Sequence, residues 1–209
     1  MKLVCISDTH GYHDTMHVPA GDVLIHAGDL TKRGTVEETR AAAEWLERLP
    51  HEHKIVIAGN HDFLFERDPA AARALFTHAT YLEDQAVVID GVRFYGSPYT
   101  PEFFNWAFML PRGHALRAKW SHIPNGTDVL VTHGPPHKIL DLTLHGDRAG
   151  CEALAERVAE LKPRLHVFGH IHEGYGTQGD ASSETHFMNA SICTFDYRPK
   201  NAPIVFDLT

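Results

Sequence analysis

Nine polar side chains follow five short apolar runs, and together they could hold metal ions and transfer protons. They are Asp8, His10, Asp29, Asn60, His61, Asp62, His133, His170 and His172. Nitrogen and oxygen ligands without thiolate suit Mn, Fe, Zn or Ni better than calcium, and among these we favour Mn. Seven of the nine are candidate metal ligands, which is more than the four that one four-coordinate ion needs. The set therefore predicts two divalent ions, bridged by a carboxylate such as Asp29.

Each of these residues has a simpler interpretation when it is taken alone. An Asp or His after a strand is usually a turn former, a helix cap or a satisfied core residue. Five separate strand ends carry such residues here, and that joint pattern favours a metal centre.

The apolar runs before these residues are typical of buried strands, because they are short and rich in β-branched residues. They span residues 3–7, 22–29, 54–60, 128–134 and 165–170. Ligands bind at the carboxyl ends of parallel strands in open α/β sheets, which is where the polar residues fall. A strand places residues i and i+2 on one face, so we expect Asp8 with His10, and His170 with His172, to point the same way.

Helical patterns separate these strands. They cover residues 35–49, 68–76 and 150–161, the second with an Asp cap before Pro69. Residues 85–97 are predicted to form a hairpin that turns at Asp90 and Gly91, and strands are expected within 186–195 and 202–208. The predicted fold is α/β, a two-sheet mixed β sandwich flanked by helices, in one domain spanning residues 1–209.

Charge and composition limit the function. Nineteen Lys and Arg against 27 Asp and Glu give a net charge of −8, which argues against a protein that grips long nucleic acid. The apolar run at the N-terminus is too short for a signal peptide, and no stretch has membrane-spanning length, so we expect a cytoplasmic enzyme without a membrane partner. The three cysteines have no CxxC spacing and are expected to be reduced packing residues.

The ordered blocks DxH, GD, GNHD, HG and GHxH resemble the calcineurin-like metallophosphoesterases, with the small brain-type metallophosphoesterase-domain subgroup most similar in the stretches 96–113 and 188–208. The resemblance implies a four-layer αββα fold. It also implies that one metal is held by Asp8, His10, Asp29 and His172, and the other by Asp29, Asn60, His133 and His170. His61 and Asp62 are then catalytic, and Asn60 and His61 bind substrate. Asp62 departs from the Glu of many relatives, and its shorter reach puts in doubt how it would orient His61.

We therefore predict a dinuclear phosphodiesterase that acts on small diesters, cyclic nucleotides among them, by attack of a metal-bridging hydroxide. His61 would protonate the departing oxygen or stabilise its charge. A phosphomonoesterase, a nuclease and a non-catalytic scaffold are the alternatives, and a homo-oligomer is possible. No GxSxG, P-loop or GxGxxG motif supports other chemistry.

Two further groups of residues have open interpretations. His13, His137 and His145 follow motif loops and could reach the mouth of the site. Two other histidines are expected in the core, His26 and His166. Loop or surface positions are expected for His51, His53, His78, His122 and His186. Aromatic residues in 101–110 could form a wall against a nucleobase or a partner subunit, or a short helix packed inward (Phe103, Phe104, Trp106 and Phe108).

Overall fold

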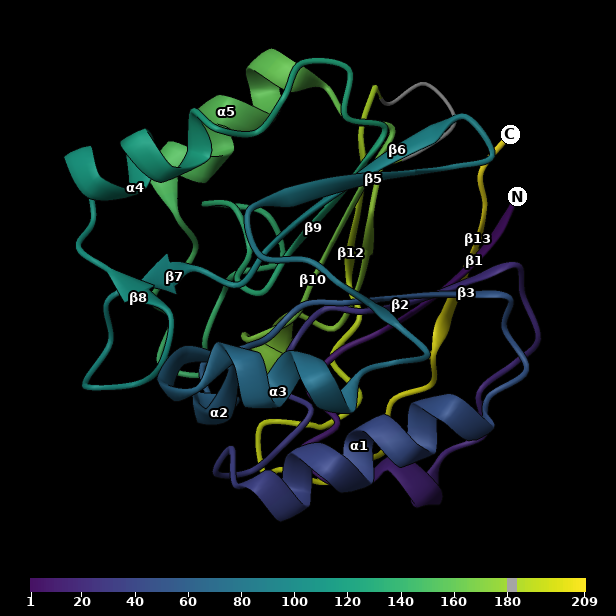
Figure 1. Cartoon of the computed structure of the whole chain (residues 1–209). Helices are drawn as coiled ribbons and strands as arrows, with labels where there is room; N and C mark the ends of the chain where they lie inside the picture. The colour runs from purple at the N-terminus through teal and green to yellow at the C-terminus, as the bar shows by residue number, and fades with distance from the viewer. Residues whose placement is uncertain (180–183) are drawn as a thin grey trace.

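Two large mixed sheets form the centre of the computed structural model, which describes residues 1–179 and 184–209 (Figure 1). In the first sheet, β1 pairs in parallel with β2, β2 with β3, and β3 with β4, while β13 lies antiparallel beside β1. The strands are β1 (Lys2–Ile6), β2 (Val23–His26), β3 (His53–Val56), β4 (Thr80–Tyr81) and β13 (Ile204–Asp207).

The second sheet also has a parallel centre. β12, β10, β9 and β6 run in parallel, and an antiparallel strand closes each edge, β11 next to β12 and β5 next to β6. The strands are β5 (Gln85–Ile89), β6 (Val92–Ser97), β9 (Val129–Thr132), β10 (Leu165–Phe168), β11 (Gly176–Gln178) and β12 (His186–Asn189). The predicted hairpin is confirmed as β5 and β6, with Asp90 and Gly91 at positive φ in its turn.

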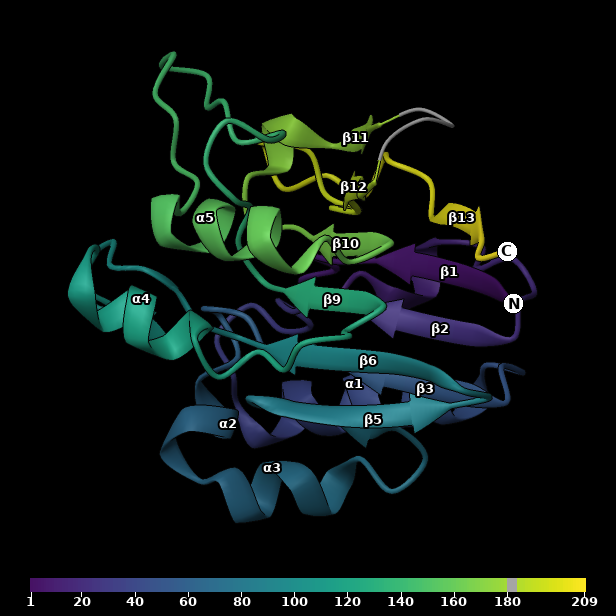
Figure 2. The same cartoon turned by 90° about the horizontal axis from the view of Figure 1, so that it is seen from above.

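Helices cover the outer faces of both sheets. Figure 1 shows α1, α2 and α3 on one side of the strands and α4 and α5 on the other, and Figure 2 shows the same arrangement from above. The helices are α1 (Val36–Arg48), α2 (Phe63–Arg67), α3 (Pro69–Leu75), α4 (His114–Trp120) and α5 (Glu152–Leu161). This arrangement confirms the predicted two-sheet sandwich flanked by helices.

Three apolar clusters hold these layers together. One lies between the sheets and includes Ile25, Ile57 and Val131, all fully buried. The other two fill the space between each sheet and its helices, where Trp45 of α1 and Trp120 of α4 are buried. Burial of such apolar surface is the main favourable term in folding, at roughly 25 cal/mol per Å².

The helices begin where the sequence indicates. Thr35 caps α1 with a capping box, in which its hydroxyl accepts from the Glu38 N–H and the Glu38 carboxylate accepts from the Thr35 N–H. The carboxylate of Asp68 caps α3 ahead of Pro69. Cys151 caps α5 through its sulfur, which accepts from the Leu154 N–H, and all three cysteines are free and buried as expected.

Some predicted elements differ from the structure. Residues 101–110 form no helix, because Thr100–Pro101 (β7) pairs with Met109–Leu110 (β8) and the loop between them turns at Phe104 and Phe108, both at positive φ. The helices α2 and α4 and the strand β11 were not predicted, because each is too short to show clear periodicity. No helix in the described part of the chain is long and apolar enough to cross a membrane. The single-domain assignment stays a prediction.

Candidate metal centre and active site

The predicted site residues lie where parallel strands of both sheets end. Asp8 and Asp29 follow β1 and β2, Asn60 follows β3, and His133 and His170 follow β9 and β10. An isolated bridge between Ser7 and Ser191 joins the two sheets at this edge. Segments far apart in the chain therefore meet at one place, as the sequence predicts.

The local geometry at this edge differs from the strand alternation that we predicted. Asp8, His10, Asp29 and His170 all have positive φ, between 42° and 67°, and His172 lies in a 3-10 turn (His172–Gly174). Alternation requires extended backbone, and these residues stand beyond the strand ends in left-handed turns. The side chains converge because of the turns, so the explanation by alternation was wrong.

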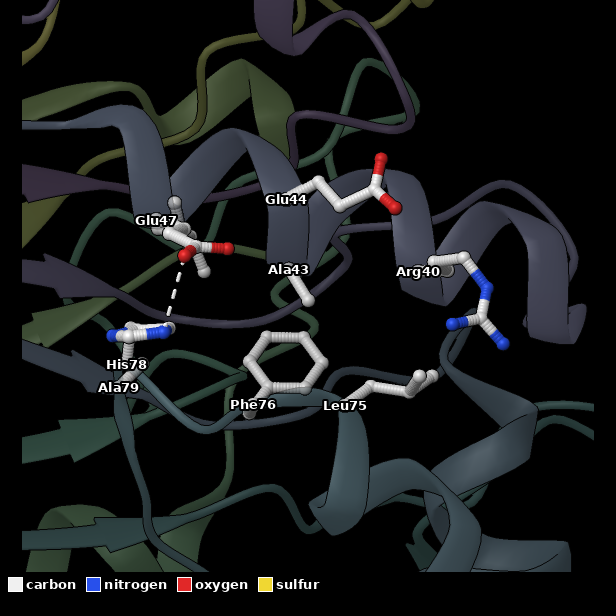
Figure 3. A pocket seen from close by; sticks show the side chains of 9 residues that line it. Arg40, Ala43, Glu44, Glu47, Leu75, Phe76, His78 and Ala79 are labelled. Atoms are coloured by element: carbon white, nitrogen blue, oxygen red, sulfur yellow. Dashed lines mark ion pairs between the residues drawn. The ribbon is translucent and has the colours of Figure 1, made fainter.

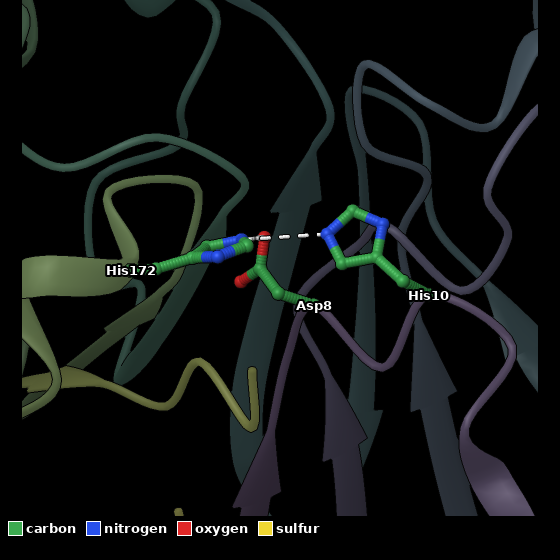
Figure 4. A group of neighbouring side chains, drawn as sticks. All are labelled: Asp8, His10 and His172. Atoms are coloured by element: carbon green, nitrogen blue, oxygen red, sulfur yellow. Dashed lines mark hydrogen bonds and ion pairs between the residues drawn. The ribbon is translucent and has the colours of Figure 1, made fainter. Parts of the chain in front are cut away.

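Asp8, His10 and His172 form the first candidate ligand group (Figure 4). The Asp8 Oδ1 lies 3.3 Å from His172 Nε2, and the two Nε2 atoms of His10 and His172 are 3.3 Å apart. All three residues are buried. Nitrogen and oxygen atoms this close, without thiolate, form a set that a transition metal or zinc ion would accept.

Asp29 connects this group to a second one. Its Oδ2 lies 3.7 Å from His10 Nε2 and 3.4 Å from His133 Nε2. His133 Nε2 in turn lies 2.9 Å from the Asn60 Oδ1. Asp8, Asp29 and His133 form one candidate group, and His10, Asp29 and His61 form another. Asp8 and Asp29 each belong to two of the three groups. Asp29 also approaches His10 and His133 with the same oxygen, as a bridging ligand would.

The imidazoles are oriented as metal ligands are. Nδ1 of His10 lies 3.2 Å from the carbonyl of Thr31, Nδ1 of His133 lies 2.9 Å from that of Ala27, and Nδ1 of His172 lies 3.0 Å from that of Thr194. A carbonyl only accepts, so each Nδ1–H donates and each Nε2 faces the cluster. Ligating histidines commonly donate their second N–H to a carbonyl or carboxylate, and this fixes the tautomer.

Electrostatics at the site favour added positive charge. Burial opposes ionisation of Asp8, yet the hydrogen bond and charge of His172 hold the Asp8 pKa well below its usual range. Burial likewise acts to lower the pKa of His133, but Asp29 and Asp8 raise it to about 9. Two buried carboxylates thus keep protons on neighbouring imidazoles, and a divalent ion would replace those protons.

Two glycines let the backbone approach this cluster. A Cβ on Gly169 would collide with the carboxylate of Asp8 and the hydroxyl of Ser7. A Cβ on Gly59 would collide with Asp29 and would lie 2.6 Å from Cε1 of His133. The glycine within GHIH is therefore required by the close packing of the site.

His61 is held at the edge of the cluster. Its Nδ1–H donates to the Lys32 carbonyl at 2.8 Å, and its backbone N–H donates to Asp29 Oδ1 at 2.8 Å. The indole of Trp106 lies against its ring, with centroids 4.3 Å apart and planes tilted by 31°. Nε2 is the ring atom left without a partner in the described residues, and His61 lines the adjoining cavity.

Asp62 is buried, and in the described part of the chain no hydrogen bond joins its carboxylate to the imidazole of His61. It accepts from the N–H groups of Leu30, Thr31 and Gly59 at 3.2, 3.0 and 2.8 Å. Burial and the charge of Asp29 raise its pKa to about 6. Asp62 therefore ties the loop after β2 to the loop after β3.

A cavity of about 550 Å³ opens onto the cluster. Asp29, Asn60, His61, His170 and His172 line its inner part. His170 belongs to none of the three candidate groups, although its ring centroid lies 5.0 Å from that of His133 and its N–H donates to Asp8 at 3.0 Å. Figure 3 shows a separate hollow of about 80 Å³ between α1 and the segment Leu75–Ala79, crossed by a His78–Glu47 pair at 3.1 Å.

The other histidines divide between the site and the core. His145 lines the cavity, whereas His137 lines a different one and His13 is buried with its ring stacked on Trp45. His26 and His166 are buried, as expected. The expectation of loop or surface positions was wrong for His53 and His186, which are half-buried in β3 and β12. His51 lies in the loop before β3, as expected, although its ring is buried against the Pro19 carbonyl.

The aromatic stretch divides between the core and the cavity, and it does so without forming the helix that was one of its two interpretations. Phe108 is 2% exposed and packs in the core. Phe103 and Trp106 line the cavity, and Phe104 is exposed. Tyr197, which sequence reasoning missed, lines the cavity as well, and no motif in the sequence marks it.

The chain was compared with known proteins. The family model described as calcineurin-like phosphoesterase matches residues 1–174. The human and mouse proteins named metallophosphoesterase domain-containing protein 1 are each 46% identical to this chain, over 99% of it and 71% of their own length. The crystal structure of TT1561 of Thermus thermophilus has a TM-score of 0.62 at 16% identity, covering 90% of this chain and 88% of that one, which shows a shared fold. The chain therefore belongs to the calcineurin-like phosphoesterase family, which supports a metal-dependent phosphoester hydrolase.

Proposed function

We propose that this protein hydrolyses small phosphodiesters, cyclic nucleotides among them, at a site that holds two divalent metal ions. The position of Asp29 carries the proposal, since its Oδ2 lies within 3.7 Å of His10 Nε2 and 3.4 Å of His133 Nε2. One ion would be held by Asp8, His10, Asp29 and His172, and the other by Asp29, Asn60, His133 and His170. The mixed nitrogen and oxygen ligands suit Mn, Fe, Zn and Ni, and manganese is the ion that we favour among them.

Bound divalent ions supply positive charge to phosphoryl oxygens and lower the pKa of water. The residues of the chain supply the remaining functions. Asp8 and Asp29 contribute a charge of −2, so the loaded site keeps a net charge of +2 that attracts a phosphate ester into an acidic protein. The Asn60 side-chain amide and the His61 ring face the ester from the loop after β3.

His61 has the geometry of a proton donor to the leaving group. The Lys32 carbonyl occupies Nδ1 and Trp106 packs against the ring, so Nε2 is the atom that would hold and give up a proton. A positioned general acid contributes about 10²–10⁴ in rate. Asp62 supports proton donation by His61, because its carboxylate accepts from three backbone N–H groups and so holds the loop after β2 against the loop after β3.

The test compares three kinds of substrate on one preparation purified without chelator. Metal content is measured by elemental analysis, and turnover is measured with bis(p-nitrophenyl) phosphate, p-nitrophenyl phosphate and cyclic nucleotides. We expect two ions per chain and faster turnover of diesters. A strong preference for the monoester would make the protein a phosphomonoesterase, and absence of bound metal together with no turnover across several added metals would make it a scaffold.

A further inference from the structure

Three aromatic side chains line the cavity beside the candidate metal ligands. Phe103 and Trp106 come from the loop between β7 and β8, and Tyr197 comes from the loop after β12. All three line the 550 Å³ cavity. Phe103 is 59% exposed and Tyr197 is 47% exposed, so their faces are available to a ligand.

Tyr197 lies closest to the candidate metal ligands. Its ring centroid is 4.9 Å from that of His10 and 5.1 Å from that of His172, and it is 6.2 Å from that of His61. Its φ is +56°, a conformation that non-glycine residues seldom adopt and that often occurs at functional sites. Position 197 lies beyond residues 1–174, which the family model matches.

Both loops are attached to the site itself. The Ala107 N–H donates to the Asn60 carbonyl at 3.2 Å, and the Thr194 carbonyl accepts from His172 Nδ1 at 3.0 Å. The Tyr197 N–H then donates to that same carbonyl at 2.8 Å. The aromatic faces are therefore held in fixed positions relative to the candidate metal ligands.

Charges around the cavity disfavour substrates with additional phosphate groups. The lining residues include two arginines, and both are already bonded, Arg112 to Glu152 at 2.7 Å and Arg148 to Asp141 at 2.7 Å. Carboxylates also line the cavity (Glu102, Asp147 and Glu173). The part of a substrate outside the metal cluster thus meets aromatic faces and negative charge.

We propose that Phe103, Trp106 and Tyr197 form an aromatic subsite that binds the second ester group of a singly charged phosphodiester and selects planar, unsaturated groups there. The subsite rests on the proposed function, because it presumes that the reacting phosphate lies at the metal cluster. Aromatic faces contact flat unsaturated groups favourably through offset or edge-to-face packing. A methyl or other small ester leaves these faces uncovered.

Two chromogenic diesters test this selection. Phenyl p-nitrophenyl phosphate and methyl p-nitrophenyl phosphate share a leaving group and a charge of −1, and differ only in the second ester group. In the wild-type protein we expect the phenyl diester to have the higher kcat/KM. Tyr197→Ala should reduce the ratio of the two kcat/KM values about 3- to 10-fold with metal content unchanged, while Tyr197→Phe keeps the ratio.

The chain offers matched control variants. Phe195 lies in the same loop as Tyr197 and Phe104 lies beside Phe103; both are exposed, at 56% and 74%, and neither lines the cavity. Phe195→Ala and Phe104→Ala should keep the wild-type ratio, whereas Phe103→Ala lowers it. An unchanged ratio in Tyr197→Ala, or equal loss with both diesters, would overturn the subsite.

A binding measurement separates the subsite from the proposed function. Calorimetry with diphenyl phosphate and dimethyl phosphate, on the metal-loaded protein, reports the preference without turnover. If the protein hydrolyses no diester but binds diphenyl phosphate more tightly, and Tyr197→Ala removes that difference, the subsite stands and the proposed function fails. Equal affinities for the two ligands in the wild-type protein would refute the subsite.

Discussion

Replacing Asp29 by Asn separates metal binding from catalysis. The amide keeps the size of the side chain and can still accept the His61 N–H, which now donates to Asp29 Oδ1 at 2.8 Å. The change removes one of the two carboxylate charges beside His10 and His133. Two unit charges about 4 Å apart interact by about 4 kcal/mol at an effective dielectric of 20, and the interaction with a divalent ion is larger, so the loss of one carboxylate charge should lower metal affinity by at least roughly 10³. Because Asp29 faces both candidate groups, we expect both ions to bind more weakly.

The matched variant is His61→Gln, which removes the proposed proton donor. His61 lies near His10 and Asp29 but is not among the seven ligands that we propose. It should keep the wild-type metal content and lose about 10²–10⁴ in kcat. Asp147→Asn serves as the control, because this exposed carboxylate lines the same cavity and belongs to no candidate ligand group.

The assay measures bound metal by elemental analysis after dialysis at a fixed free-metal concentration, alongside turnover of bis(p-nitrophenyl) phosphate. We expect Asp29→Asn to hold less than one ion per chain, while the other two variants hold as many as the wild-type protein. Full metal content in Asp29→Asn would refute the bridging position, and equal metal loss in His61→Gln would refute the separate role of His61.

Three further predictions concern other parts of the structure. Gly169→Ala should lower metal content, because the added Cβ would displace the Asp8 carboxylate. The control Gly91→Ala, where no atom lies within 4 Å of the added Cβ, should keep the wild-type metal content, as measured by elemental analysis. Burial lowers the pKa of His166 to about 3, below the usual 6.5, so its contribution to stability is lost as pH falls from about 6.5 toward 3. His166→Gln should therefore reduce the slope of unfolding free energy against pH in that window by about 1.4 kcal/mol per pH unit, which urea unfolding at several pH values measures. Thr35→Ala removes the side-chain cap of α1 and should lower the unfolding free energy by about 1 kcal/mol in the same assay, and no change would contradict the capping role.

The sequence was sufficient to predict which residues meet, because strand ends follow from hydrophobic pattern and sheet edges follow from the order of the strands. Asp8, Asp29 and His133 were identified in this way, although each comes from a different strand. Their conformation could not be predicted, since the pattern of apolar residues carries no information on positive φ at a non-glycine residue such as Asp8.

Residues on irregular loops were the hardest to place. Tyr197 reaches the site through a turn fixed by hydrogen bonds to Thr194, and neither periodicity nor a motif indicates such a contact. The sequence allows Trp106 to line the binding site or to pack inward on a short helix. Only the pairing of β7 with β8 decides between these two positions. Asp62 could be predicted as part of the site, but its three backbone partners depend on the tertiary arrangement of two loops.

Four of the seven residues that would bind metal have an unusual backbone conformation. Asp8, His10, Asp29 and His170 are in the left-handed region, where a non-glycine residue is disfavoured by about 1–3 kcal/mol. Asp8 and Asp29 are also buried, and their negative charges raise the pKa of His133 and of His172. Protons on these two histidines therefore compensate the buried negative charge. Both features oppose folding on their own, and packing between the sheets offsets them. A site built with strained turns and buried negative charge is stabilised further by any cation that binds it, so metal binding and folding stability should be coupled in this protein.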